Sequence, residues 1–167
     1  NEMGFAETTV YQNIDGEIFT PSLDMDLPDL YNTSMDSGDL DNDGDIDFVI
    51  NGQQDDGTWK KYIYKREGAQ LTPEIVTDNQ WNDNGFIDGI VKMADCGIDG
   101  DIDIYMIGEN SGQIKINTYI REYNQSWFDE WMPNMAHASM TVFGDYVYFM
   151  GVDGNYEDIR FYRKSIL

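Results

Sequence analysis

The chain has 167 residues, enough for one domain with a sizeable core, and a formal net charge of −22 from 32 acidic and 10 basic residues. Such a charge repels nucleic acid and anionic lipid, which excludes both as partners. Aromatic residues make up 14% of the chain and the apolar runs are short, so the composition favours strands and excludes membrane insertion.

The first 30 residues resemble the end of a repeat unit rather than its start. Tyr11–Pro21 (YQNIDGEIFTP) is related to Tyr64–Pro73 (YKREGAQLTP), and each segment predicts two short strands around a turn with glycine. The chain begins at Asn1, partway through a unit of this kind. We therefore expect it to be an excerpt of a longer protein.

Two acidic segments follow with the same internal spacing, Asp39–Gly52 and Asp95–Gly108, which gives an internal repeat with an offset of 56 residues. In each segment, alternating aspartates surround a glycine and lead into a short apolar strand. Alternating carboxylates around such a turn point inward and offer hard oxygens, and Ca²⁺ prefers about six to eight of them at about 2.3–2.6 Å. The candidate ligands are Asp39, Asp41, Asp43, Asp45 and Asp47 in the first loop and Asp95, Asp99, Asp101 and Asp103 in the second.

Calcium explains these loops better than the other metals or motifs. Without a cation, two carboxylates ~4 Å apart repel by ~4 kcal/mol at an effective dielectric constant of ~20. Mg²⁺ needs a tighter octahedron, and soft metals lack Cys and His ligands here. We expect one Ca²⁺ per loop, with the backbone carbonyl of Asp45 or Asp101 as a ligand, and weaker binding where Gly97 replaces a carboxylate. An EF-hand is excluded because Ile50 and Met106 occupy its glutamate position.

A third unit near the C-terminus lacks the acidic loop, and the tight connection 143–145 replaces it. Units of four short antiparallel strands are typical of β-propeller blades. We therefore predict an all-β fold of about three blades, with 1–30 as the tail of a preceding blade, 31–84 and 85–133 as blades with calcium loops, and 134–167 as a blade without one. Since closed propellers have about four to eight blades, further blades of the same or another chain would complete the ring.

The segment Gly38–Gly52, followed by Tyr62–Pro73, resembles an FG-GAP or VCBS-type repeat, the unit of integrin-α-like β-propellers. The resemblance is strong over 31–76, fair over 85–122 and weak at both ends. It implies calcium in the loop between the first two strands of a blade, and a secreted or cell-surface protein, in most cases bacterial. The side-chain ligands that it implies are Asp39, Asp41, Asp43 and Asp47, and in the second copy Asp95, Asp99 and Asp103.

The sequence contains no constellation that indicates catalysis, so we predict that the chain is not an enzyme. His137 is its only histidine and lies between two alanines. Cys96 is its only cysteine, which excludes an internal disulfide and a Cys-based zinc site. Since Cys96 occupies the position of Leu40 in the repeat, we expect a buried apolar role for it.

The expected function is a non-catalytic, calcium-stabilised binding or scaffold module for protein interaction or adhesion, with a protein or glycan partner at the cell surface. The alternative is a carbohydrate-binding module or an accessory domain of a polysaccharide-degrading enzyme. In that case tryptophans would stack on sugar rings, although packing within blades accounts for each of them more simply. These tryptophans are Trp59, Trp81, Trp127 and Trp131.

Overall fold

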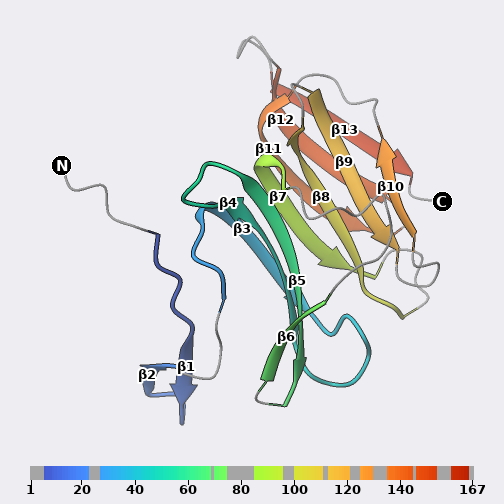
Figure 1. Ribbon diagram of the computed structural model, residues 1–167. Helices are drawn as coiled ribbons and strands as arrows, with labels where there is room; N and C mark the ends of the chain where they lie inside the picture. The colour runs from blue at the N-terminus through green and yellow to red at the C-terminus, as the bar shows by residue number, and fades with distance from the viewer. Residues whose placement is uncertain are drawn as a thin grey trace.

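The computed structural model describes residues 6–22, 27–68, 70–74, 85–95, 100–110, 113–120, 125–129, 135–144, 146–153 and 159–165. Within these residues the chain is all-β, because every regular element is a strand and every pairing is antiparallel (Figure 1). The predicted fold class is confirmed to that extent. The described part of the chain contains no helix that could span a membrane.

The strands form three larger sheets and one hairpin, and each strand pairs with its neighbour in sequence. The first sheet contains β3 (Tyr31–Gly38), β4 (Asp47–Gln53), β5 (Trp59–Glu67) and β6 (Gln70–Glu74). The second contains β7 (Ile87–Ala94), β8 (Asp103–Asn110), β9 (Gln113–Ile120) and β10 (Gln125–Asp129). The third contains β11 (Met135–Phe143), β12 (Tyr146–Asp153) and β13 (Ile159–Ser165). Such meanders are the expected result of short turns between successive strands.

A β-bulge near the start of the first strand recurs in all three sheets. In β3 the pairing with β4 shifts between Tyr31 and Ser34, and β7 and β11 shift at the corresponding place. Asn32 and Asp88, which are 56 residues apart, have positive φ angles of 50° and 49°, a conformation that Asn and Asp tolerate. The bulge therefore provides a common reference position for comparing the three sheets residue by residue. On this basis Ser34 of β3 corresponds to Ser139 of β11.

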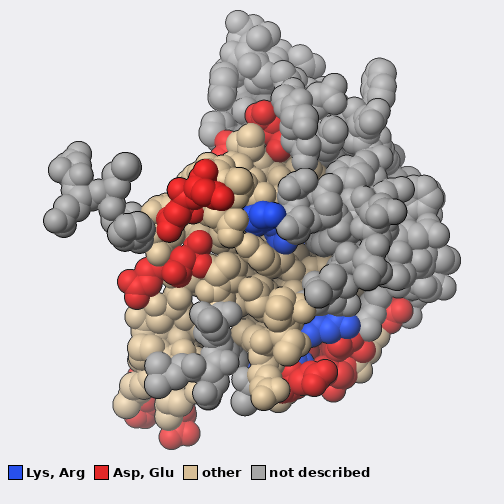
Figure 2. Space-filling model, in the orientation of Figure 1, with Lys and Arg blue, Asp and Glu red and all other residues tan. Residues whose placement is uncertain are grey.

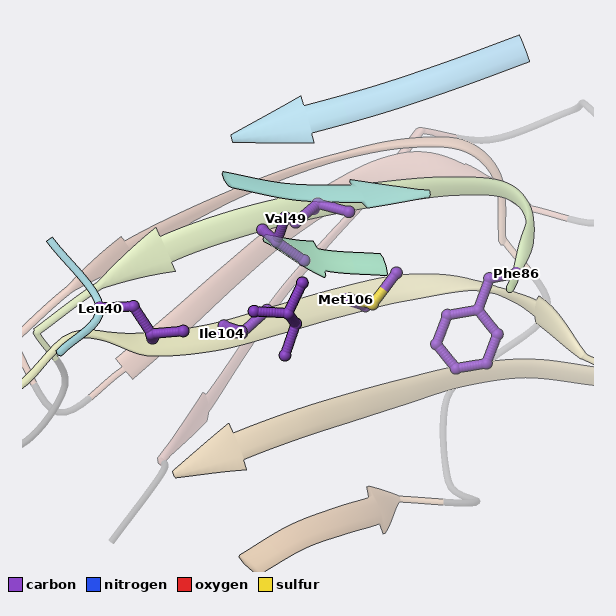
Figure 3. Close-up of a cluster of buried hydrophobic side chains, with 7 residues drawn as sticks. Leu40, Val49, Phe86, Ile104 and Met106 are labelled. Atoms are coloured by element: carbon purple, nitrogen blue, oxygen red, sulfur yellow. The ribbon is translucent and has the colours of Figure 1, made fainter. Parts of the chain in front are cut away.

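A hydrophobic core lies between the first and second sheets. Figure 3 shows Val49 of β4 above Ile104 and Met106 of β8, with Leu40 at one end and Phe86 at the other. Burial of this apolar surface supplies the main driving force for joining the sheets, at roughly 25 cal/mol per Å². Its buried members are Leu40, Val49, Ile63, Phe86, Val91, Ile104 and Met106.

The first strands of the three sheets are neighbours in space, since β3 and β11 both contact β7. Side chains of β3 accept hydrogen bonds from backbone N–H groups on the edge of β7 that does not pair with β8. The Val91 N–H donates to Ser34 Oγ at 3.0 Å, and the Met93 N–H donates to Asp36 Oδ2 at 2.9 Å. The same Asp36 oxygen lies 3.5 Å from the Lys92 ammonium. Polar side chains thus join two sheets that have no shared strand ladder.

A second polar junction forms around Asn51, which is fully buried on β4. Its Oδ1 accepts the Phe86 N–H at 2.7 Å, and its Nδ2 donates to the Phe86 carbonyl at 2.9 Å. The preceding Gly85 N–H donates to the Trp59 carbonyl at 2.8 Å. A Cβ at Gly85 would lie 2.6 Å from the backbone of Lys60, so only glycine fits this close approach. The segment before β7 is therefore fixed against the first sheet.

The hairpin of β1 (Tyr11–Ile14) and β2 (Ile18–Pro21) stands apart from the three sheets, on the side of the first sheet that faces away from β7 (Figure 1). Its register pairs Tyr11 with Pro21, just as β5 and β6 pair Tyr64 with Pro73. Its large apolar side chains, including Phe19, are exposed. The hairpin thus has the register of the last two strands of a sheet, as β5 and β6 have in the first sheet, but no described strand pairs with it.

Candidate metal centre

The first acidic loop begins and ends where β3 and β4 stop pairing, at Gly38 and Asp47. Between these residues the chain turns sharply, and carboxylate oxygens of Asp39, Asp41 and Asp43 come within 4.8 Å of one another. The first two side chains are half-buried and the third is exposed. The structure therefore brings together three of the five predicted ligands of this loop, in a cluster that could hold a metal ion.

The turn itself is held by hydrogen bonds from the backbone to aspartate side chains. Asp39 accepts the N–H groups of Asp43 and Gly44, each at 3.0 Å. The Asp45 N–H donates to Asp43 Oδ1 at 2.8 Å. Asn42 and Gly44 have φ angles of 57° and 93°, and the second of these is strained for a residue with a Cβ. These bonds fix the carboxylates close together.

One oxygen of the cluster has no hydrogen-bond partner among the described residues. Asp41 Oδ1 is buried and accepts no hydrogen bond from the described residues, whereas its Oδ2 lies 3.4 Å from Lys65 Nζ. A buried acceptor without a partner costs about 1–3 kcal/mol, and more when it is charged. A cation among the three carboxylates would satisfy this oxygen. Because the donor set is oxygen alone, it fits a hard divalent ion rather than a soft one.

The other two aspartates of the loop lie outside this cluster and make backbone contacts instead. Asp45 Oδ2 accepts the Gly68 N–H at 2.5 Å, in the turn between β5 and β6. Asp47 is fully buried and accepts the N–H groups of Leu40 at 2.7 Å and Arg66 at 2.8 Å. Burial raises the pKa of the Asp47 carboxyl, although its two backbone hydrogen bonds act in the opposite direction. Both residues fasten the loop to the neighbouring strand.

The second loop repeats part of this geometry. The Gly100 N–H donates to Asp95 Oδ2 at 3.2 Å, the counterpart of the bond between Gly44 and Asp39. Gly100 also has a φ of 94°, close to that of Gly44. Asp95 Oδ1 is buried and has no hydrogen-bond partner among the described residues, and the same holds for Asp41 Oδ1 in the first loop. Asp99, and with it residues 96–98, lies outside the described residues.

Among the described residues, a hydrogen bond between sheets joins the two loops. Asn42 Nδ2 donates to Asp101 Oδ1 at 2.5 Å. Further along the second loop, Asp103 is buried at the position that corresponds to Asp47, and the Tyr105 hydroxyl donates to it at 3.4 Å. Of the second set of predicted ligands, the structure therefore places Asp95, Asp101 and Asp103 in or beside the loop.

Charge around the loops is predominantly negative. Figure 2 shows acidic side chains outnumbering basic ones on the face in view. The sequence alone did not point to two residues near the first loop. Lys65 lies beside Asp41, and Asn42 reaches the second loop. Strand alternation gives no signal for Lys65, and the repeat gives none for Asn42 because its counterpart is Ile98.

The remaining sequence candidates are not tested by the structure. Trp59 is half-buried on β5, and it is the one tryptophan whose side chain is described. The side chains outside the described residues are those of Trp81, Trp127, Trp131, Cys96 and His137.

No protein-family model, no curated protein and no solved structure matches this chain. The resemblance to FG-GAP repeats therefore stays a prediction, and the arguments that follow depend on the geometry of the chain itself.

Proposed function

We propose that this chain is a non-catalytic, calcium-stabilised β-propeller module that serves as a binding or scaffold unit of a secreted or cell-surface protein. The observation that carries the calcium assignment is the cluster of Asp39, Asp41 and Asp43 with the buried, unpartnered Asp41 Oδ1. These three side chains would hold the ion. The ion would supply charge neutralisation, and so keep in place a loop that carboxylate repulsion would otherwise open.

Calcium is favoured over magnesium because of how the loop is built. The carboxylates belong to one short turn whose backbone bonds set their spacing. Calcium accepts six to eight oxygens in irregular arrangements, whereas Mg²⁺ demands near-octahedral geometry and retains several waters. Extracellular calcium modules bind with dissociation constants of about 0.1–1 mM, which suits a structural role outside the cell.

The propeller arrangement is supported by the order of strands and sheets. The first strand of each sheet lies at its edge, and the edge strands β3 and β11 each neighbour β7, the edge strand of the second sheet. Later strands extend outward from them in sequence order. A radial array of antiparallel meanders around their first strands is the plan of a propeller, in which adjacent sheets share a core.

The adhesion or scaffold role is favoured over carbohydrate binding on the described residues. A sugar platform requires an exposed aromatic face beside polar groups. Trp59 is half-buried, and its carbonyl and strand position are used in packing against the segment before β7. A protein partner would therefore be recognised by the sheet edges and loops rather than by this tryptophan.

Calcium binding is tested by calorimetry and thermal unfolding of the wild type, Asp41→Asn and Glu67→Gln. The last variant removes the same charge from an exposed position at the end of β5. With a dissociation constant of ~0.1 mM, ~1 mM Ca²⁺ adds about 1.4 kcal/mol per site, or about 3–6 °C in a domain of this size. We expect this gain in the wild type and Glu67→Gln, and a loss of at least about tenfold in first-site affinity in Asp41→Asn. Equal melting of the wild type in calcium and in chelator would refute the proposal.

A further inference from the structure

The two acidic loops lie against each other, although they belong to different sheets. The Asn42 side chain of the first loop donates from Nδ2 to Asp101 Oδ1 of the second loop at 2.5 Å. Close to this polar contact, a Cβ at Gly38 would lie 3.5 Å from Ile102 Cγ2. Gly38 is the last residue of β3, and Ile102 comes immediately before β8. The loops therefore meet through a polar and an apolar contact.

On the first loop, the donor lies inside the proposed metal centre. Asn42 stands between Asp41 and Asp43, two of the three residues whose carboxylate oxygens come within 4.8 Å of one another. Its φ of 57° belongs to the turn that two backbone hydrogen bonds to Asp39 close. An ion held by this cluster would fix the turn, and with it the position of the Asn42 amide.

On the second loop, the acceptor lies beside a proposed ligand. Asp101 directly follows Gly100, whose N–H donates to Asp95 Oδ2 at 3.2 Å. Asp95 Oδ1 is buried and has no hydrogen-bond partner among the described residues. Because the Asp101 carbonyl is itself a proposed ligand, a hydrogen bond that holds the Asp101 side chain also restrains the backbone that would bind the second ion.

The repeat does not account for Asn42. Its counterpart in the second loop is Ile98, whose side chain has no hydrogen-bond donor. Asparagine tolerates a positive φ, which suits this position in the turn, but glycine would suit it equally. The feature that distinguishes the asparagine is therefore its amide, and this amide reaches the other loop.

Apolar packing beneath both loops adds to the connection. Leu40, the second residue of the first loop, is buried at the Ile104 end of the core between the sheets (Figure 3). Ile102 of the second loop and Met93 of β7 pack against the same core. Because protein cores are close-packed, a shift of one loop is transmitted to the other through these contacts.

We infer that Asn42 is a positioning residue for the calcium site of the second loop, so that an ion in either loop raises the affinity of the other. The inference rests on the proposed calcium sites, and by linkage the coupling factor is the same in both directions. One net hydrogen bond changes an equilibrium constant by about 2–12-fold, so we expect a factor of about 3–10. Repulsion between the two ions opposes this effect, but at about 0.15 M salt the Debye length is ~8 Å and exposed charges are screened.

The coupling factor is measured by calorimetric titration with Ca²⁺ at about 0.15 M salt. Asp41→Asn with Asp43→Asn disables the first site, and Asp95→Asn with Asp99→Asn disables the second. Each double variant gives the association constant of the remaining site alone. The overall two-ion constant of the wild type, divided by the product of these two constants, is the coupling factor. We expect about 3–10 in the wild type and about 1 when Asn42→Gly is added to the whole set.

A matched control separates the amide of Asn42 from the conformation of its backbone. Asn42→Gly removes the amide without straining a turn that has a positive φ. Asn32→Gly makes the same change at an exposed residue with a φ of 50°, near the end of β3 that is remote from the first loop, and should keep the wild-type factor. A merely structural role for Asn42 would lower thermal stability in chelator and leave the coupling factor unchanged.

The outcomes distinguish this inference from calcium binding itself. If the wild type takes up no calcium, both the proposed function and the coupling are overturned. Uptake of a single ion, or of two ions with a coupling factor below about 2, overturns the coupling and leaves calcium binding standing. A factor of the expected size that persists in Asn42→Gly overturns the role of Asn42.

Discussion

Asn51→Ala tests whether buried hydrogen bonds hold the first two sheets together. The substitution removes the acceptor of the Phe86 N–H and the donor to the Phe86 carbonyl, both within 2.9 Å in a fully buried site. Each backbone group left without a partner costs about 1–3 kcal/mol, which gives a loss of about 2–5 kcal/mol after partial relaxation. In a domain of this size the melting temperature would fall by about 5–15 °C.

The assay is urea and thermal unfolding in calcium buffer, with Gln53→Ala as the control. Gln53 lies two residues further along β4, and its side chain donates at 3.1 Å to the Gly57 carbonyl in an exposed turn. Its removal should cost at most about 0.5 kcal/mol. Asn51→Leu removes the same two hydrogen bonds but fills the site with an apolar side chain, as Ile107 does at the corresponding position of the second sheet. Comparison with Asn51→Ala therefore separates the loss of hydrogen bonds from the loss of side-chain volume. If Asn51→Ala melted together with Gln53→Ala, the polar junction would have no role in joining the sheets.

Two further predictions concern the first acidic loop. Lys65→Gln should tighten calcium binding by about 2–5-fold, because the ammonium 3.4 Å from Asp41 repels the incoming ion, and an unchanged affinity in calorimetry would contradict this. Gly44→Ala should weaken binding by about 5–30-fold, because a φ of 93° costs a residue with a Cβ about 1–2 kcal/mol. The matched change Gly38→Ala meets only ordinary contacts at 3.5 Å and should leave the affinity as in the wild type.

The sequence predicted the strands because local patterns determine them. Each acidic loop leads into an apolar run, and these runs form β4 and β8. Asp39, Asp41 and Asp43 also come together as predicted, since the bonds that close the turn join residues at most five apart. Alternation and turn residues within a short window were sufficient for both features.

Features that depend on distant segments were not predictable in this way. The Asp47 carboxylate accepts the N–H of Arg66 on β5, 19 residues away, and the local pattern of the loop carries no signal for this contact. Asn51 bonds to Phe86 at a separation of 35 residues, and its repeat counterpart is Ile107, so periodicity gave no warning. The bulge at Asn32 did have a signal, because Asp88 stands 56 residues later and both residue types tolerate positive φ.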